Sequence, residues 1–478
     1  MGSVSRLLKN TSVLVASNFA TKGLSALFII YLARYLEDYG FGQYNFALSF
    51  ASVFIIFSDM GLDALTIKNV ARMPETAGQY LEAVGIMRLA LSLIMVSAAL
   101  LGGYILGLED FLLALIMVSG LTYLFDKMSG LFYAIFRARE RMELEAGTQI
   151  LWKLVQIGLG LGAIALGFSL MEIMLVLLVS SVIKTIIGFS ALLAMGIRPE
   201  RGQLGLRRLT ADAAPFAAYE VGNALYLNLT VIMLFLLTAP EDTGWFSAAF
   251  RILMFIMLVP SAFDAAIYPL FSRLNQRSGA DMKFAYGKSI KFSLVAALPV
   301  AVLLAVLSTE FAGLFGSDFE NTGQALFIMA GIIPLFTLNM LMKTALWSGD
   351  RQGTMARNIW FSAAVLAVAA FLLVREEGYV GAALALIIGE ASFFVLNYAG
   401  IRRKGYPMGM YLWRPVIAGI AMAGIALVMH WAIGQQVSRP YISVVSATAY
   451  VLLLLVLGVF TKSDRAIFKG ILRRNKSQ

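Results

Sequence analysis

The sequence predicts an all-α polytopic membrane protein with about fourteen transmembrane helices. Hydrophobic residues make up 60% of the 478 positions and charged residues only 14%, with a mean hydropathy of +0.80. Soluble domains are nearer about 45–50% apolar and about 25% charged. The apolar residues fall in blocks of about twenty, long enough for a helix to cross a hydrocarbon core of about 30 Å. The loops between the blocks alternate in charge, as expected of a chain that crosses a membrane repeatedly.

The apolar blocks define the predicted helices. In chain order they cover residues 11–33, 42–62, 83–106, 111–136, 146–167, 171–195, 213–238, 244–270, 288–307, 323–346, 357–374, 379–401, 412–433 and 440–461. We expect two pseudo-symmetric six-helix lobes plus two C-terminal helices. The N-terminal lobe would cover residues 1–205, the C-terminal lobe 206–405, and the two additional helices with a basic tail 406–478.

Lysine and arginine concentrate in alternate loops. One set of loops, together with both chain ends, carries 26 of the 38 basic residues, whereas the other set carries only Arg34, Arg375 and Arg439. Cytoplasmic loops of membrane proteins are rich in Lys and Arg. The sequence therefore predicts a multi-pass protein of the cytoplasmic membrane with both termini in the cytoplasm. The net charge of +10 follows from this topology, and the sequence offers no soluble basic face for a nucleic acid.

The sequence has few residues suited to catalysis or metal binding. It contains no cysteine and one histidine, His430, whereas a metal site needs several ligands. The glycine-rich run GLGLGAIALG (158–167) is not followed by the GK[ST] of a nucleotide-binding loop. We predict a protein that is not an enzyme and that binds no cofactor and no metal. An H⁺ or Na⁺ gradient, the membrane potential or downstream use of the product would then drive it.

A weak internal repeat links the second and eighth predicted helices. FGQYNFALSF (41–50) matches TGWFSAAFRI (243–252) at an offset of 202 residues, which pairs Gly42 with Gly244, Tyr44 with Phe246, and Ala47 with Ala249. The repeat recurs at the same ordinal place in two six-helix halves. Repeated halves are a common transporter design, with the substrate handled at their interface near the bilayer midplane.

The segment over residues 29–72 resembles the amino-terminal signature of the polysaccharide-transporter flippases. The similar motifs are LARYL (32–36), FGQY (41–44), DMGL (59–62) and VAR (70–72). The resemblance implies the fold of the multidrug/oligosaccharidyl-lipid/polysaccharide exporters, with two six-helix lobes around a central cavity and alternating access. It also implies a cationic cavity in relatives that move lipid-linked oligosaccharides, and a greater dependence on acidic residues in the drug-extruding branch.

Basic residues deep within the predicted helices suggest where a substrate binds. Lys22 lies about eleven residues, roughly 16 Å, from either end of its helix, and such residues rarely face lipid. A diphosphate accepts charge-assisted hydrogen bonds from Lys and Arg. We assign substrate diphosphate binding to Lys22, Lys153 and Arg251, with Lys127 and Lys184 as further cavity cations. The resemblance supports Lys22 and Arg251, because the lipid II flippase branch uses basic residues in helices 1 and 8.

Uncharged polar residues lie at helical spacing beside these cations. Asn18 and Ser25 share a helix face with Lys22, and Asn223 and Tyr226 share a face of segment 213–238. We predict that these four side chains position the substrate in the cavity. The alternative role is hydrogen bonding between helices.

Four carboxylates lie at deep or semi-deep positions of the predicted helices. Asp126, Glu220 and Asp264 are candidates for gating or ion coupling, by taking up a proton or Na⁺, and Glu390 is a fourth deep acid. These groups could instead pair with nearby cations. Asp126 and its neighbour Lys127 point to different helix faces, so we do not expect them to neutralise each other.

The predicted function is that of a flippase for a polyprenyl-diphosphate-linked oligosaccharide. It would carry this lipid from the inner to the outer leaflet, for surface polysaccharide or glycoprotein assembly. The partners would be the lipid-linked glycan, membrane lipid and a polysaccharide polymerase or glycosyltransferase. One alternative is a cation-coupled multidrug or metabolite antiporter of the same fold. Another is a scaffold of a polysaccharide-assembly complex, against which the abundance of deep charge argues.

Overall fold

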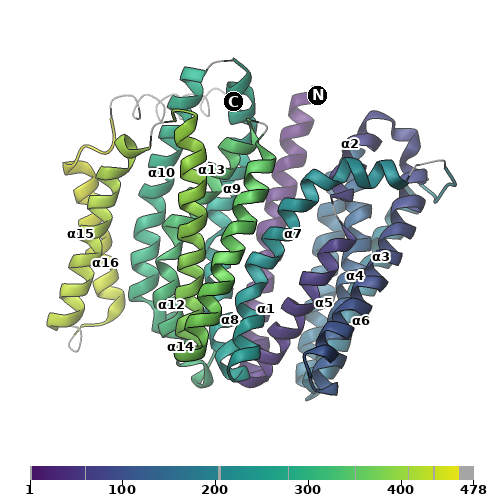
Figure 1. The fold of residues 1–478 in the computed structure, drawn as a ribbon, viewed down its shortest axis with the longest axis horizontal. Coiled ribbons are helices and arrows are strands. Elements are labelled where there is room, and N and C mark those ends of the chain that lie inside the picture. Colours follow the sequence, from purple (N-terminus) through teal and green to yellow (C-terminus); the bar gives the residue numbers. More distant parts are fainter. Residues whose placement is uncertain are drawn as a thin grey trace.

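The computed structural model describes residues 3–59, 61–202, 206–277, 279–349, 351–406, 408–433, 437–461 and 464. Within these ranges every regular element is helical, which confirms the predicted all-α class (Figure 1). The elements are α1 (Ser3–Ile55), η1 (Ile56–Ser58), α2 (Leu62–Arg72), η2 (Pro74–Thr76), α3 (Ala77–Ile105), α4 (Asp110–Ala138), α5 (Met142–Ala165), α6 (Leu170–Ala194), α7 (Leu206–Leu237), α8 (Pro240–Ile256), α9 (Leu258–Arg277), α10 (Gly279–Val306), α11 (Ser308–Ala312), η3 (Ser317–Phe319), α12 (Thr322–Ala330), α13 (Ile332–Trp347), α14 (Gln352–Arg403), α15 (Gly409–Ile433) and α16 (Arg439–Val456).

Two of these helices are too long to cross a membrane once. Helix α1 has 53 residues and α14 has 52, so each would be about 80 Å long if straight, against a hydrocarbon core of about 30 Å. Each is broken at one residue with positive φ, Glu37 (57°) in α1 and Gly378 (55°) in α14. Helix α14 therefore contains two of the predicted spans, and α1 contains one predicted span and most of the next.

The other spans bring the total close to the prediction. In the described ranges, ten helices are long and apolar enough to cross a membrane, and two bent pairs, α8 with α9 and α12 with α13, raise the number to twelve. Counting α1 and α14 as two spans each gives about the fourteen that hydropathy predicts.

Proline explains both bent pairs, which the hydropathy blocks 244–270 and 323–346 present as continuous helices. Helices α8 and α9 meet at a bend of 40°, and α12 and α13 at one of 47°. Pro260 and Pro334 are the third residues of α9 and α13. A proline has no N–H for the carbonyl four residues earlier, and its ring clashes with that carbonyl. In both pairs that carbonyl belongs to the last residue of the preceding helix.

The predicted span 42–62 is also interrupted. Helix α1 ends at Ile55, η1 follows, and α2 starts at Leu62 after Gly61, whose φ is 80°. Glycine adopts this left-handed conformation without steric cost. The DMGL motif is therefore a helix break, and it presents the carboxylate of Asp59 at the end of the span.

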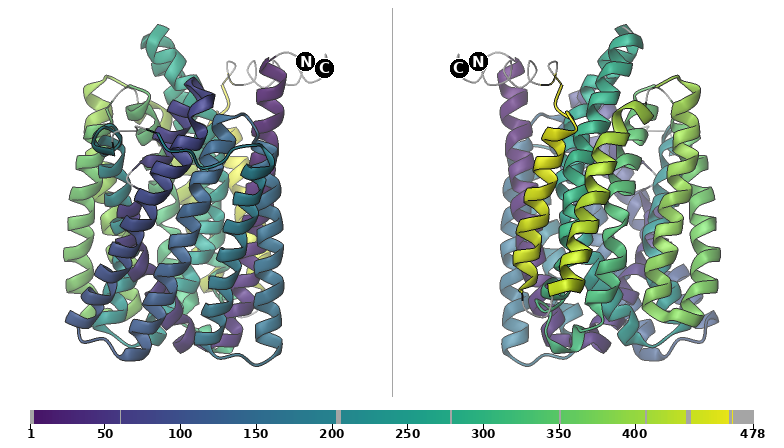
Figure 2. Two further views of the ribbon diagram at one scale, coloured as in Figure 1. Left: turned by 90° about the vertical axis from the view of Figure 1, so that its right-hand side faces the viewer. Right: turned by 90° about the vertical axis from the view of Figure 1, so that its left-hand side faces the viewer.

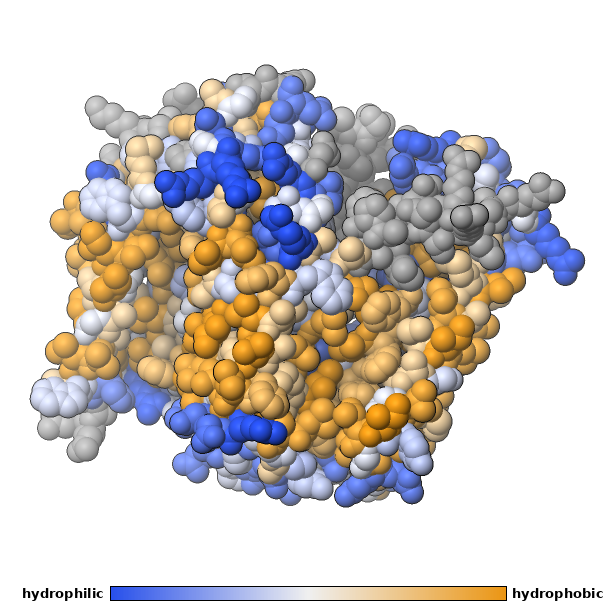
Figure 3. All heavy atoms as spheres, in the orientation of Figure 1, coloured by the Kyte–Doolittle hydropathy of each residue, from blue (hydrophilic) through white to orange (hydrophobic). Residues whose placement is uncertain are grey.

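The helices form two groups and a lateral pair. Helices α1, α3, α4, α5 and α6 pack on one another, and α7, α8, α10, α12, α13 and α14 form a second group. Helices α15 and α16 pack on α10 at the far side of the second group (Figure 1). On the face shown in Figure 3, apolar side chains cover the middle of the molecule and hydrophilic residues lie at its two ends, with a hollow between the groups.

The start of α1 and the end of α16 lie at the same end of the bundle, which we call the termini end (Figure 2). Asp464, beyond α16, joins this end to α10. It accepts hydrogen bonds from Lys288 (2.6 Å) and Lys291. Burial alone would raise the pKa of Asp464, but the hydrogen bonds from Lys288, Lys291 and Thr461 outweigh it and hold the pKa well below its ordinary value.

At the opposite end the two groups meet backbone to backbone. A Cβ added to Gly42 would lie 1.9 Å from the carbonyl oxygen of Pro240, and one added to Gly244 would lie 2.2 Å from that of Asp38. Phe46 of α1 stacks on Phe235 of α7, with ring centroids 4.0 Å apart. The two glycines paired by the sequence repeat thus face each other across the interface, where no larger residue fits.

Candidate functional site

Two lysines and an aspartate meet inside the first helix group. Lys184 of α6 forms an ion pair with Asp126 of α4, Nζ to Oδ1 at 2.9 Å. Lys153 of α5 donates to Oε1 of Gln156 at 2.5 Å. Both ammonium groups lie against the indole of Trp152, 4.3 Å (Lys153) and 4.2 Å (Lys184) from the ring centroid. Cation–π attraction of this kind holds ammonium groups over aromatic faces, so Trp152 fixes the two lysines side by side.

Arg251 adds a third cation to these two lysines, from the other side of the interface between the two helix groups. The guanidinium, on α8, donates from Nη2 to Oδ1 of Asn45 on α1 at 3.0 Å. Tyr123 of α4 lies near both Arg251 and Asp126, so Arg251 borders the lysine pair across the interface. We call Lys153, Lys184, Arg251 and Asp126 the cationic cluster. Three cations face one carboxylate, so the cluster carries net positive charge.

Lys22 lies in the part of α1 that packs against α5. Near it, the Ser17 hydroxyl donates to the carbonyl of Ala146 at 3.4 Å, which places this part of α1 against α5. Leu27 is 68% exposed, as expected of a lipid-facing side chain, and five residues separate the two positions, so Lys22 points about 140° away from Leu27 around the helix. Lys22 is exposed, and it forms no ion pair within the described part of the chain. Its assignment to the diphosphate stays a prediction.

Lys127 belongs to a different and charge-balanced group. Arg88 of α3 binds Asp59 at 2.7 Å and Asp63 at 2.9 Å, and Lys127 binds Asp59 at 3.3 Å. Two cations thus meet two carboxylates. Adjacent in sequence, Asp126 and Lys127 have separate partners, which confirms that they do not neutralise each other. Because Lys127 is paired here, it adds no net charge to the cationic cluster. Its assignment to the diphosphate stays a prediction.

Glu220 faces the charge-balanced group from the second helix group. This residue of α7 interacts electrostatically with Lys343, Asp59 and Lys127. Helix α7 also packs against η1, which Asp59 follows, and against α2, which carries Asp63. Glu220 is therefore placed where the two helix groups approach each other at the DMGL break.

Removal of Arg88 will destabilise the protein. The Arg88 side chain is 0% exposed and separates two carboxylates, and breaking a buried ion pair by removing one partner costs about 3–5 kcal/mol. We expect Arg88→Leu to melt well below wild type in a thermal unfolding assay in detergent. Arg141→Leu is the matched control, because Arg141 pairs with Glu143 where both are half exposed, and such pairs contribute about 0–1 kcal/mol. Equal melting temperatures for the two variants would contradict this prediction.

The predicted positioning residues are dispersed. The Ser25 hydroxyl donates to the carbonyl of Thr21 in its own helix at 2.6 Å, and Asn223 is partly buried in α7. Asn18 lies outside the part of the chain whose side chains the structure describes. Tyr226 is 2% exposed and points into the second helix group rather than between the groups, because its hydroxyl donates to Glu390 at 3.1 Å.

A buried polar network surrounds Glu390 in the second helix group. Besides Tyr226, Asn339 donates to the Glu390 carboxylate at 2.7 Å. Asn397 donates to Asn339 at 3.3 Å, and Asn358 to Asn397 at 2.9 Å. All these partners are neutral amides or a phenol. The sequence marks Glu390 as a deep acid but assigns it no role, although Asn397 lies seven residues later on the same helix face.

Asp264, the remaining predicted carboxylate, is buried and accepts a hydrogen bond from the Thr344 hydroxyl at 2.5 Å. In the described ranges, no three His, Cys, Asp or Glu side chains gather as they would around a metal ion. Within the cationic cluster, Asp126 is the carboxylate that pairs with a lysine, Lys184.

Known proteins resemble this chain in sequence and in fold. A family model for polysaccharide biosynthesis proteins matches residues 7–275. The chain is 23% identical over 398 residues to the probable low-salt glycan biosynthesis flippase Agl15 of Haloferax volcanii, and the match covers 82% of both proteins.

Solved structures share the architecture. The lipid II flippase MurJ in an inward closed conformation matches with a TM-score of 0.71 at 12% identity, covering 94% of this chain and 98% of that one. An inward-facing multidrug resistance MATE family transporter of the MOP superfamily matches with a TM-score of 0.64 at 16% identity, covering 81% and 94%. These likenesses confirm the exporter fold that the sequence predicts.

Proposed function

The chain belongs to the polysaccharide biosynthesis protein family, and from this we propose that it is a flippase for polyprenyl-diphosphate-linked oligosaccharide. It moves this lipid from the inner to the outer leaflet of the cytoplasmic membrane by alternating access and leaves it chemically unchanged. The observation that carries the proposal is the cationic cluster, where three cations face one carboxylate. The names of Agl15 and MurJ, both flippases, support the same function.

The cluster suits a diphosphate in charge and in geometry. Phosphate oxygens accept strong charge-assisted hydrogen bonds, and Arg can offer two parallel donors. Lys153 and Lys184 come from one helix group and Arg251 from the other, so a diphosphate held by all three would join the two halves. Lys22 would add a fourth cation from α1. The polyprenyl chain would remain in the lipid between the lobes.

The direction of transport follows from the loop charges and the glycine contact. The basic loops assign the termini end to the cytoplasm. At the opposite end, the Gly42–Gly244 contact closes the interface. The substrate would therefore enter from the cytoplasmic side and leave after this contact opens. A polymerase or glycosyltransferase would then use the delivered oligosaccharide.

An H⁺ or Na⁺ gradient or the membrane potential would drive the cycle. Asp126, Glu220 and Asp264 are the carboxylates for which the sequence suggests coupling, and Glu390 joins them. Asp126 pairs with Lys184, whereas the hydrogen-bond partners of Glu390 are neutral. A buried carboxylate without a cation partner gains most from taking up a proton or Na⁺, so we favour Glu390 for this role.

Translocation in proteoliposomes tests the function. Purified wild-type protein should move lipid-linked oligosaccharide to the opposite leaflet, and we expect Lys22→Ala and Arg251→Ala to be at least about tenfold slower, since each removes a charged hydrogen-bond donor. Lys68→Ala, an exposed cation of α2, is the matched control and should keep the wild-type rate. Unchanged translocation in both cavity variants would exclude the diphosphate site.

The likeness to a MATE family transporter supports a second candidate, a cation-coupled multidrug or metabolite antiporter. Glu220 and Asp264 would then carry the coupling ion. Drug efflux by the wild type that is lost in Glu220→Gln, together with no movement of lipid-linked oligosaccharide, would favour this function over the flippase.

A further inference from the structure

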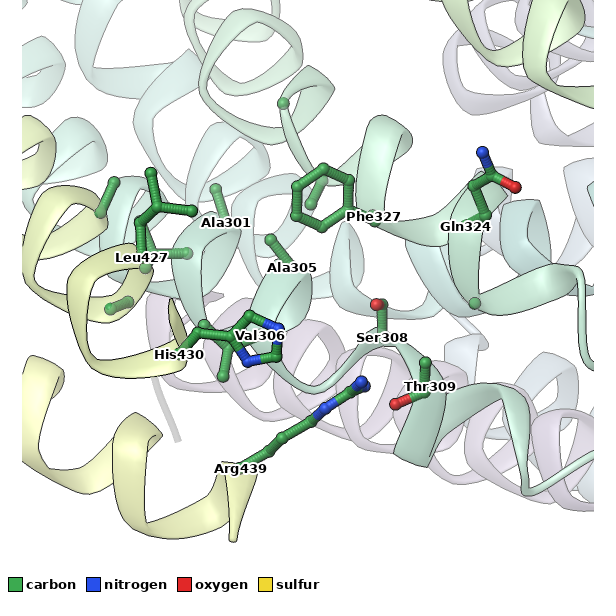
Figure 4. Close-up of a pocket in the computed structure, with 16 residues that line it drawn as sticks. Ala301, Ala305, Val306, Ser308, Thr309, Gln324, Phe327, Leu427, His430 and Arg439 are labelled. Atoms are coloured by element: carbon green, nitrogen blue, oxygen red, sulfur yellow. The ribbon is translucent and has the colours of Figure 1, made fainter. Parts of the chain in front are cut away.

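A cavity lies between the lateral helix pair and the second helix group, and no residue of the cationic cluster lines it. It is a groove of about 600 Å³ lined by residues of α10, α11, α12, α15 and α16 (Figure 4), a volume within the range of about 300–1,000 Å³ typical of ligand sites. Its walls are apolar and its polar side chains gather at one end, where Ser308, Thr309, Gln324, His430 and Arg439 are found.

Small residues create this groove. Helix α15 packs closely on α10 at Gly419, where an added Cβ would lie 3.1 Å from the Leu298 side chain. Beyond this contact, alanine and glycine occupy the facing surfaces and leave space between the helices. These small lining residues are Ala301, Ala305, Gly323, Ala330, Gly331, Ala423 and Ala426. The exposed side chains of Phe327 and Leu427 border the space, so its wall is continuous with the lipid-facing surface.

The polar end of the groove lies at the level of a membrane surface. Trp431, next to His430, is 89% exposed, and Tyr441, next to the start of α16, is 55% exposed. Tryptophan and tyrosine concentrate where lipid head groups meet the hydrocarbon core. Residues 430 and 439 flank the connection from α15 to α16, at the end of the bundle opposite the termini.

The polar end offers both donors and an acceptor. Arg439 lies 3.6 Å from Glu310, and both side chains are about one-third to two-fifths exposed (34% and 41%), so each can bind another group. Gln324 accepts a hydrogen bond from Tyr379 at 2.8 Å, which leaves its NH₂ group as a donor. The Arg439 guanidinium and the His430 ring both point into the mouth of the groove (Figure 4).

We propose that this groove binds one glycerophospholipid of the leaflet opposite the termini. An acyl chain lies along the apolar wall between α12 and α15, and the phosphodiester accepts hydrogen bonds from Arg439 and His430. An amine-bearing head group places its ammonium beside Glu310. The bound lipid fills the gap between α15 and the second helix group and so holds the lateral pair in place. This site is separate from the cationic cluster and does not depend on the flippase function.

Native mass spectrometry of the delipidated full-length protein with added phosphatidylethanolamine tests this site. We expect wild type to retain one phospholipid. The double variant Arg439→Ala/His430→Ala should retain at least about tenfold less at the same lipid concentration, because it removes both hydrogen-bond donors to the phosphodiester. Ala423→Phe should also lose the lipid by filling the groove. Arg375→Ala, which removes an exposed cation near the same end, is the control and should bind as wild type does.

Two results would overturn the proposal. One is equal phospholipid retention in wild type, the double variant and Ala423→Phe, each first checked for folding by size-exclusion chromatography. The other is displacement of the phospholipid by polyprenyl phosphate at lower concentration, which would assign the groove to the transported lipid. The double variant should still translocate lipid-linked oligosaccharide, because loss of the bound phospholipid leaves the cationic cluster intact. Its translocation rate therefore distinguishes a failure of this groove from a failure of the flippase site.

Discussion

The triple variant Lys153→Met/Lys184→Met/Asp126→Asn is expected to lose translocation of lipid-linked oligosaccharide by about 100-fold or more. Two charge-assisted contacts, each contributing about 1.5–3 kcal/mol, disappear together. The variant removes the carboxylate with its lysine partner, so no unpaired charge is left in the helix group. Methionine keeps the length and the apolar stem of lysine. The measurement is the initial rate of translocation in proteoliposomes at matched protein density.

Asp126→Asn alone is the control that distinguishes substrate binding by the cations from ion coupling by Asp126. It keeps Lys153, Lys184 and Arg251 and raises the net charge of the cluster by one. If the cluster binds a diphosphate, this variant should translocate at the wild-type rate or bind substrate more tightly. Loss of transport in Asp126→Asn, equal to that of the triple variant, would instead identify Asp126 as a coupling carboxylate.

Gly42→Ala is expected to abolish transport by preventing closure of the interface opposite the termini. The added Cβ would lie 1.9 Å from the carbonyl oxygen of Pro240, far inside contact distance, and a backbone atom cannot rotate away. Gly244→Ala should have the same effect through Asp38. Both variants should favour a state open at this end. Gly162→Ala is the control, because nothing lies within 4 Å of its added Cβ, and an alanine there favours the helix by about 0.5–1 kcal/mol.

Labelling can detect this change of state directly. The chain contains no cysteine, so Asn45→Cys introduces a single thiol beside Arg251. In the Gly42→Ala background we expect this thiol to react at least about tenfold faster with a membrane-impermeant maleimide added from the side opposite the termini. An unchanged labelling rate together with wild-type transport would contradict this prediction. It would mean that α1 and α8 accommodate the added Cβ without any change in the balance between the closed and open states.

Much of the candidate site could be anticipated because deep cations are rare in membrane helices. The sequence marks Lys153, Lys184 and Arg251 on this ground, and in the structure Trp152 lies against both lysines. Lys127 looked equivalent in sequence, yet its partner Asp59 lies 68 residues away. Tyr226 looked like a cavity residue because its helix face is polar, but that face turns toward Glu390. Periodicity identifies a shared face without telling which neighbour it meets.

The amino-acid sequence alone determined the class of the protein, its approximate number of spans and the segments they occupy. These depend on local hydrophobicity, because each apolar block of about twenty residues must be helical to satisfy its own backbone in lipid. The tertiary structure decided which charges pair, where α8–α9 and α12–α13 bend, and that Gly42 meets Gly244 across the interface. It also formed the groove beside α15, because a cavity depends on how far apart whole helices pack. Such distances are set jointly by residues scattered along the chain, and no single segment encodes them.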